Sequence, residues 1–337
     1  MKRNLTRMFA VLLTLGLLAG CGSKPNAVYN KETQTAPKPA EMEPVASLKI
    51  GQLPVIDGLA FWVAEQKNYY KEQGVDIELI TFQSALERDA ALEGGQIDGT
   101  MTDILGAVGL YANGTKVQIA SLALGATKEE SPFAIIAAPN SGINSAADLK
   151  NVEVAISLNS VIHYTTEKML LENGLTADEI KLTNIPQIPV RFEALMSGQV
   201  KAATLPEPLL SLAVAKGAKV ILSDADAKQN YSHSVIVFSD KAVKEKAEGL
   251  KRFFLAYNLA VLDIKADPTA YRELLAEKAK LPAEIKDSFK VTPFSPAQAP
   301  QKADVEAVIQ WLLDKKIISK QVTYEEIVNL TLAPKAQ

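Results

Sequence analysis

Short apolar runs alternate along the chain with longer segments in which apolar residues recur every three or four positions. The runs predict strands, and the segments between them predict helices. The first block has predicted strands at residues 48–53, 77–82 and 97–101, and predicted helices at 59–71 and 86–93. The second block has predicted strands at 152–157, 180–185 and 200–205, and predicted helices at 160–172 and 190–197. This alternation is typical of an α/β fold with parallel sheets covered by helices on both faces.

The two blocks are related by an internal duplication. Residues 77–101 align without a gap on residues 180–204, and the word Gly95-Gln96 returns as Gly198-Gln199. A period near 100 residues is far too long for a solenoid. The sequence therefore predicts two lobes built to one plan.

Other segments connect and extend these blocks. Strands are predicted at 133–138 and 234–238, where the chain passes between the lobes, and a proline-rich loop at 293–300. The region after Asp240 is predicted to be helical, with helices at 242–263, 268–279 and 302–315.

The N-terminus has the pattern of an export signal. Basic residues at positions 2, 3 and 7 precede an apolar run at 8–18, which is short for a membrane-spanning helix. The run ends in Leu18-Ala19-Gly20-Cys21, which resembles a lipobox. We expect residues 1–20 to be a signal peptide, Cys21 to be lipidated, and residues 21–46 to be a flexible tether. The alternative is a stray cysteine beside an ordinary cleavage site.

Composition and missing motifs narrow the function. Cys21 is the only cysteine, so a disulfide within the chain is impossible, as is a cysteine-based metal site. With 36 basic and 39 acidic residues and no long basic run, nucleic acid is not an expected partner. Motifs for serine hydrolases, zinc proteases, phosphate loops and dinucleotide sites are missing. These absences favour binding over catalysis, with no cofactor and no metal.

Ligands of open α/β sheets bind where strands end and helices begin. The residues predicted to contact a ligand there are Asp57, Gln83, Ser84, Arg88, Asp103, Asn159, His163, Gln187, Arg191 and Glu207. Some have a structural alternative: Asp57, Asn159, Asp103 and Glu207 could be helix caps or first-turn acids. The two arginines could pair with Asp103 and Glu207 or be exposed helix charges, and His163 could be a core residue. His233, beside the second crossing, is expected to pack or to form a hinge hydrogen bond. Three acids at the junctions argue against a simple inorganic anion, which prefers helix N-termini free of carboxylates.

Several longer words carry a family resemblance. They are GQLPVIDGLAFWVAEQKNYYKEQGVDIEL, ALEGGQIDGTMTD, SGINSAADLKNVEVAI and GQVKAATLPEPLLSLAVAKGAKVI. Over residues 47–265 the chain resembles solute-binding proteins of ABC importers, in the branch with nitrate, sulfonate, taurine and thiamine-pyrimidine receptors. The resemblance implies the periplasmic-binding-protein type II fold, with two Rossmann-like lobes joined by two crossover segments. Lobe 1 would comprise residues 47–128 plus 234–332, and lobe 2 residues 129–233.

The resemblance also implies the partners. A monomer held outside the cell membrane by its lipid would capture a solute between the lobes and deliver it to an ABC permease and its ATPase. We expect a small organic molecule with hydrogen-bond donors, such as a zwitterion or a nitrogen heterocycle. Two alternatives stay open: a sensor lobe for a membrane kinase, and an enzyme on the same fold. The export signal argues against the enzyme.

Overall fold

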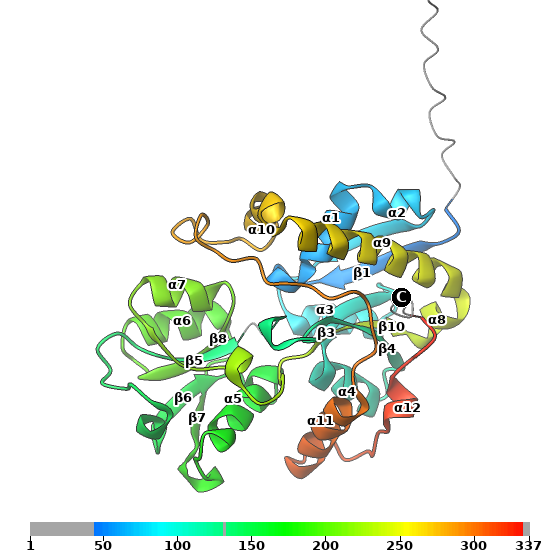
Figure 1. Cartoon of the computed structure of the whole chain (residues 1–337). Helices are drawn as coiled ribbons and strands as arrows, with labels where there is room; N and C mark the ends of the chain where they lie inside the picture. Colours follow the sequence, from blue (N-terminus) through cyan, green and yellow to red (C-terminus); the bar gives the residue numbers. More distant parts are fainter. Residues whose placement is uncertain (1–43, 131–132, 333–337) are drawn as a thin grey trace, which may run out of the picture. The chain divides into compact units, whose positions relative to one another are not determined.

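The computed structural model describes residues 44–130 and 133–332, which belong to one compact unit (Figure 1). The predicted signal peptide, Cys21 and the tether up to residue 43 lie outside the described residues. Across the described ranges, no helix has both the length and the apolar character needed to cross a membrane.

The first of two five-stranded sheets combines four strands from the first block with one strand that returns from the second. Its strand order is β2-β1-β3-β10-β4. The strands are β1 (Ser47–Gln52), β2 (Asp76–Thr81), β3 (Gly99–Asp103), β4 (Val117–Leu124) and β10 (Ser234–Ser239). Strand β1 runs parallel to β2 and β3, whereas β10 runs antiparallel to β3 and β4.

The second sheet repeats this plan with the order β7-β6-β8-β5-β9. Its strands are β5 (Phe133–Ala137), β6 (Glu153–Ile156), β7 (Lys181–Asn184), β8 (Ala202–Pro206) and β9 (Lys219–Ser223). Strand β6 is parallel to β7 and β8, and β5 is antiparallel to β8 and β9. The predicted fold class, two α/β lobes with two crossover segments, is confirmed.

The prediction of purely parallel sheets is wrong for the two crossing strands. Strand β10 begins at Ser234, opposite Asp103 at the end of β3, and β5 begins at Phe133, opposite Pro206 at the end of β8. Each crossing thus delivers the chain to the edge of the sheet where the parallel strands end. A strand that starts at that edge runs antiparallel to the strands beside it, so both sheets are mixed.

The helices of the two lobes correspond closely. The first lobe contributes α1 (Leu59–Gln66), α2 (Tyr69–Glu72), α3 (Ala85–Glu93) and α4 (Ile104–Ala112). The second contributes α5 (Val161–Glu172), α6 (Ile188–Met196) and α7 (Leu209–Ala215). Helices α3 and α6 differ by 103 residues at both ends, as do strands β3 and β8. The duplication seen in the sequence is therefore a duplication of structure.

The C-terminal region is helical as predicted, with more breaks. Its helices are α8 (Asp240–Glu245), α9 (Ala247–Ala266), α10 (Arg272–Lys278), α11 (Lys302–Asp314) and α12 (Tyr324–Ile327). Short 3₁₀ turns are η1 (Ile56–Gly58), η2 (Lys128–Glu130), η3 (Ala146–Leu149), η4 (Ala177–Glu179), η5 (Asp224–Asp226) and η6 (Pro268–Tyr271). The predicted helix 59–71 is also divided, because Asn68 adopts a left-handed conformation with φ 61° between α1 and α2.

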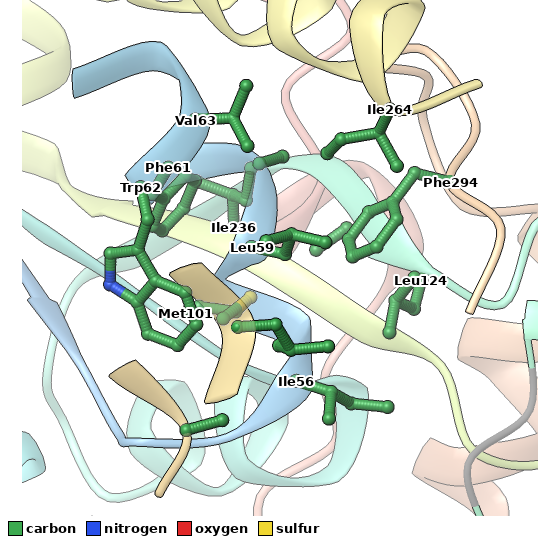
Figure 2. Close-up of a cluster of buried hydrophobic side chains, with 14 of the residues drawn as sticks. Ile56, Leu59, Phe61, Trp62, Val63, Met101, Leu124, Ile236, Ile264 and Phe294 are labelled. Carbon is green, nitrogen blue, oxygen red and sulfur yellow. The ribbon is translucent and has the colours of Figure 1, made fainter. Parts of the chain in front are cut away.

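The first six residues of α1 are all buried, which explains their continuous apolar sequence, and its last two residues are polar and exposed. Figure 2 shows Leu59 and Phe61 clustered with Met101 of β3 and Ile236 of β10. On the other side, α9 packs along α1, and the rings of Phe61 and Phe253 meet edge to face with centroids 5.5 Å apart. Each buried side chain of this size contributes about 1.5–3 kcal/mol. The core thus fixes α1, and with it the loop that follows β1.

A glycine at the meeting of β3 and β10 tests this packing. An added Cβ at Gly99 would lie 2.3 Å from Cδ1 of Phe238 and 2.6 Å from the Val237 carbonyl oxygen. We therefore expect Gly99→Ala to lower the free energy of unfolding by roughly 1–3 kcal/mol, measured by urea denaturation. The control is Gly109→Ala in α4, where a Cβ meets nothing within 4 Å. That substitution should stabilise by about 0.5–1 kcal/mol; equal effects at both positions would contradict the packing argument.

Candidate functional site

A cavity of about 170 Å³ lies where the strand ends of both sheets meet. The side of the first sheet contributes Leu53, Val55, Asp57, Arg88, Met101, Thr102 and Asp103. The side of the second contributes Phe133, Val161, Ile162, Ile188, Pro206 and Glu207. The return segment into β10 adds Ser232, His233 and Ser234. The walls are mostly apolar, with a few polar groups, as is typical of small-molecule sites.

Asp57 is placed by the turn η1 directly after β1. The hydroxyl of Ser234, the first residue of β10, donates a hydrogen bond of 2.7 Å to Asp57 Oδ2. Burial raises the pKa of the Asp57 carboxyl, and the bond from Ser234 offsets this only in part. The contact joins the first turn after β1 to the segment that returns from the second lobe.

Asp103 ends β3 and caps α4. The backbone N–H of Gly106 donates a 2.7 Å hydrogen bond to Asp103 Oδ1, so the alternative role as a helix cap is real. Burial raises the pKa of Asp103, and the Gly106 bond and the charge of Arg88 counteract it. One carboxylate oxygen caps the helix, while the side chain also forms part of the cavity wall.

Glu207 follows β8, at the place that corresponds to Asp103 plus one residue. Its two oxygens accept hydrogen bonds from Ser211, one from the backbone N–H at 3.1 Å and one from the hydroxyl at 2.8 Å. Burial raises the pKa of this carboxyl as well, despite both bonds. The cavity thus holds three carboxyl groups, each contacted by neutral donors.

Arg88 lines the cavity, but its guanidinium is occupied. It donates hydrogen bonds of 3.0 Å to the carbonyl of Met101 and to the hydroxyl of Thr102. It also forms an ion pair of 2.7 Å with Asp89. The residue is only 5% exposed. Arg88 therefore braces α3 against β3, and its charge is already neutralised.

Arg191 repeats this brace in the second lobe and does not line the cavity. It is fully buried and donates to the carbonyls of Thr204 at 2.9 Å and Ile185 at 2.6 Å. Thr204 stands 103 residues after Met101, the residue whose carbonyl Arg88 contacts. Burial lowers the pKa of Arg191 to about 10. The duplicated arginines hold helix to strand, a role that the sequence interpretation did not consider.

The other predicted contact residues also lie outside the cavity wall. Gln83, Asn159 and Gln187 are exposed, and Ser84 caps α3 by accepting from Glu87 N–H. For these residues a ligand contact stays a prediction. Four of the ten residues predicted from the sequence do line the cavity: Asp57, Arg88, Asp103 and Glu207.

His163 joins α5 to α11 instead of facing the cavity. Its ring meets that of Trp311 edge to face at 4.9 Å, and its Nδ1 accepts a 3.2 Å bond from the Asn159 N–H. Burial lowers its pKa. One turn further along the two helices, Lys315 forms a 2.6 Å ion pair with Glu167. These contacts link the helix that follows β6 to the C-terminal region.

Several wall residues escaped the sequence interpretation. The apolar residues Phe133, Val161 and Ile188 give no signal that separates a cavity wall from a core. Ser232 and Ser234 had a weak signal, since they flank a predicted crossing. His233 lines the cavity, and its Nε2 lies 3.3 Å from Asp304 Oδ2. This contact resembles the hinge hydrogen bond that was one of the two roles predicted for His233.

The comparisons with known proteins agree with this architecture. The model of the family described as NMT1/THI5 like matches residues 56–271. The chain belongs to this family. A Bacillus subtilis (strain 168) protein named for binding aliphatic sulfonates is 24% identical over 291 residues, which are 85% of this chain and 79% of the relative. That relative is, by its name, a solute-binding protein.

Two solved structures illustrate the shared fold. The alkanesulfonate-binding protein SsuA of Xanthomonas axonopodis pv. citri, bound to MOPS, has a TM-score of 0.71 at 19% identity, over 86% of this chain and 99% of that one. The nitrate-binding protein NrtA of Synechocystis PCC 6803 has a TM-score of 0.67 at 13% identity, over 85% and 87%. These two structures show that this NMT1/THI5-like chain has the same fold as SsuA and NrtA.

The buried carboxyl groups predict an unusual pH dependence. The pKa of Asp57 is raised, so the folded protein holds more protons than the unfolded chain between the ordinary and the raised value. Stability falls as the pH rises through this window. Asp57→Asn removes the buried charge and keeps an acceptor for Ser234. We expect it to raise the melting temperature of solute-free protein at pH 7.5 by roughly 2–4 °C, with no gain near pH 4.

The matched control has the opposite sign. Asp148 is exposed, and hydrogen bonds from Asn144 and Ser145 lower its pKa. Asp148→Asn should therefore lower the melting temperature at pH 7.5, with the loss fading as the pH falls through the lowered pKa. Differential scanning calorimetry at several pH values measures both. A pH-independent Asp57→Asn effect would show that its carboxylate bears no burial penalty.

Proposed function

We propose that this protein is an extracytoplasmic, membrane-anchored solute-binding protein that captures a small organic molecule between its two lobes and delivers it to an ABC importer. The observation that supports this most is the cavity at the junction of the two sheets. Polar groups reach it from η1, from the end of β3, from the segment after β8 and from the start of β10. A ligand there would contact both lobes and the connection between them.

Capture would follow from those contacts. A ligand that touches both lobes favours the arrangement in which they are close, by as much as it binds that arrangement better. Exclusion of water then strengthens each polar contact. The contacts of His163 with Trp311 and of Glu167 with Lys315 would restrict how far α5 moves from α11. We infer lobe boundaries at residues 47–128 plus 234–332 and at residues 129–233, with the hinge at the two crossings.

Binding without turnover is the simpler interpretation of the polar groups. Each cavity carboxylate is hydrogen-bonded to a neutral donor, and His233 is paired with Asp304. No hydroxyl on the wall is paired with a histidine base in the described residues. The protein would deliver its solute, as a monomer, to an ABC permease and its ATPase. The similarity to a protein named for binding aliphatic sulfonates supports the solute-binding part of this proposal.

Recovery of the bound solute tests the capture function. The full chain, purified in mild detergent from its native membrane, should carry close to one small organic molecule per protein, identified by mass spectrometry. Glu207→Gln keeps the Ser211 contacts and removes a cavity charge, so retained solute should fall about tenfold, as for loss of a charged hydrogen bond. The control Glu284→Gln removes an exposed carboxylate paired with Lys216 and should change nothing. Equal retention in all three proteins would place the ligand elsewhere.

The membrane anchor has its own test. We propose that Cys21, the only cysteine, is acylated after removal of residues 1–20. Cys21→Ser would leave no thiol to modify, so the full chain should move from the membrane fraction to the soluble extracytoplasmic fraction. Immunoblots of both fractions measure this, with Ser23→Ala as the matched control. Retention of Cys21→Ser in the membrane would contradict the anchor.

A further inference from the structure

The cavity has an excess of negative groups. Asp57, Asp103 and Glu207 form part of its wall, and none of them makes an ion pair among the residues that the structure describes. The one arginine of the wall, Arg88, is paired with Asp89 at 2.7 Å. His233 lies 3.3 Å from Asp304. The one permanently charged cation of the wall is therefore already paired, and the three carboxyl groups are not.

The carboxyl groups also keep free hydrogen-bonding capacity. Asp57 accepts from Ser234, Asp103 from Gly106, and Glu207 twice from Ser211. Two carboxylate oxygens offer about four acceptor sites, so each group retains some for a ligand. Groups of this kind bind N–H donors, and most strongly when the donor is charged.

A metal ion and a quaternary ammonium fit the wall less well. Within the described ranges, no three carboxylate or histidine side chains come close enough together to hold a metal. Phe133 is the one carbocyclic ring among the wall residues, whereas quaternary ammonium groups are held by several aromatic faces. The carboxyl groups therefore fit best a cation that has N–H groups to donate to them.

The remaining wall sets the size and nature of the ligand body. Leu53, Val55, Met101, Val161, Ile162 and Ile188 give the cavity apolar sides. Its volume of about 170 Å³ is close to that of a cavity of about 150 Å³ that holds one benzene molecule. The apolar part of the ligand is thus about as large as one six-membered ring.

We propose that this cavity binds an organic cation with N–H donors, a protonated amine or an amidinium, on a compact apolar body. This assignment rests on the proposed capture function and narrows its substrate class. It differs from the ligand classes in the names of the relatives, since sulfonate and nitrate are anions. The raised pKa values of Asp57 and Glu207 support it, because the carboxylates lack a counter-charge that a bound cation would supply.

Three isosteric probes separate charge from shape: benzamidine, benzamide and benzoate have nearly the same shape and carry a positive, zero and negative charge. Isothermal titration of the full chain, freed of solute, should give at least about tenfold tighter binding for benzamidine than for benzamide. Benzoate and butanesulfonate should show no heat of binding. Calcium and zinc ions should show none either.

Two cavity variants locate the cation. Glu207→Gln and Asp57→Asn should each weaken benzamidine binding by about tenfold and leave benzamide binding unchanged. Glu284→Gln is the control, and circular dichroism confirms folding of each variant. If one variant fails to fold, the other decides the result alone. Unchanged benzamidine binding in the folded variants would overturn the assignment.

The outcomes also separate this inference from the capture function. Binding of butanesulfonate or benzoate without binding of benzamidine overturns the cation and leaves a solute receptor for anions. Equal affinity for benzamidine and benzamide overturns the role of charge. Absence of benzamidine binding overturns the assignment as well, while solute recovered by mass spectrometry still supports capture. A recovered solute that lacks a basic nitrogen contradicts the assignment of a cationic ligand and leaves the capture function standing.

Discussion

Everything in this molecule depends on how the chain passes between its two sheets. Both crossings reach a sheet at the edge where its parallel strands end, so β5 and β10 run backwards between their neighbours. Ser234 is consequently opposite Asp103, and Phe133 is opposite Pro206. The carboxyl ends of β3 and β8 therefore lie next to the connections. Residues at these strand ends and at the connections line one cavity.

The polar groups at this junction divide into two kinds. The duplicated arginines, Arg88 and Arg191, donate hydrogen bonds to backbone carbonyls of the neighbouring strand and so hold helix to sheet. The three acids accept from neutral donors and keep an unbalanced charge in a partly buried place. Buried charges without a partner reduce stability. Binding sites commonly keep such destabilising charges, because the same groups supply affinity when a ligand of complementary charge binds.

The relatives show that one scaffold serves different ligand chemistries. Solved structures of proteins named for alkanesulfonate and nitrate binding share this fold at identities of 19% and 13%. In this chain, an anion placed 4 Å from one cavity carboxylate would meet a repulsion of about 4 kcal/mol at an effective dielectric constant of 20. Since side chains at strand ends do not hold the fold together, they change while the sheets persist.

The sequence by itself determined the repeating parts. Local periodicity identified β1 to β3 and β6 to β8, and the gapless alignment predicted the exact correspondence of α3 with α6. It also placed Asp57, Asp103 and Glu207 at strand ends, because strand-to-helix junctions are local features. Elements α4, β4, α7 and β9 were not predicted, although Asn113-Gly114 separates α4 from β4 and Lys216-Gly217 separates α7 from β9.

Only the tertiary structure decided which junction residues share a cavity. Arg191 and Arg88 have equivalent positions in sequence, but one is enclosed behind its strand and the other lines the wall. His163 contacts Trp311, a partner 148 positions away that no local pattern predicts. The physical reason is the same in each case: a side chain's partners come from distant segments, and their placement depends on the sheet order and on the direction of the two crossing strands.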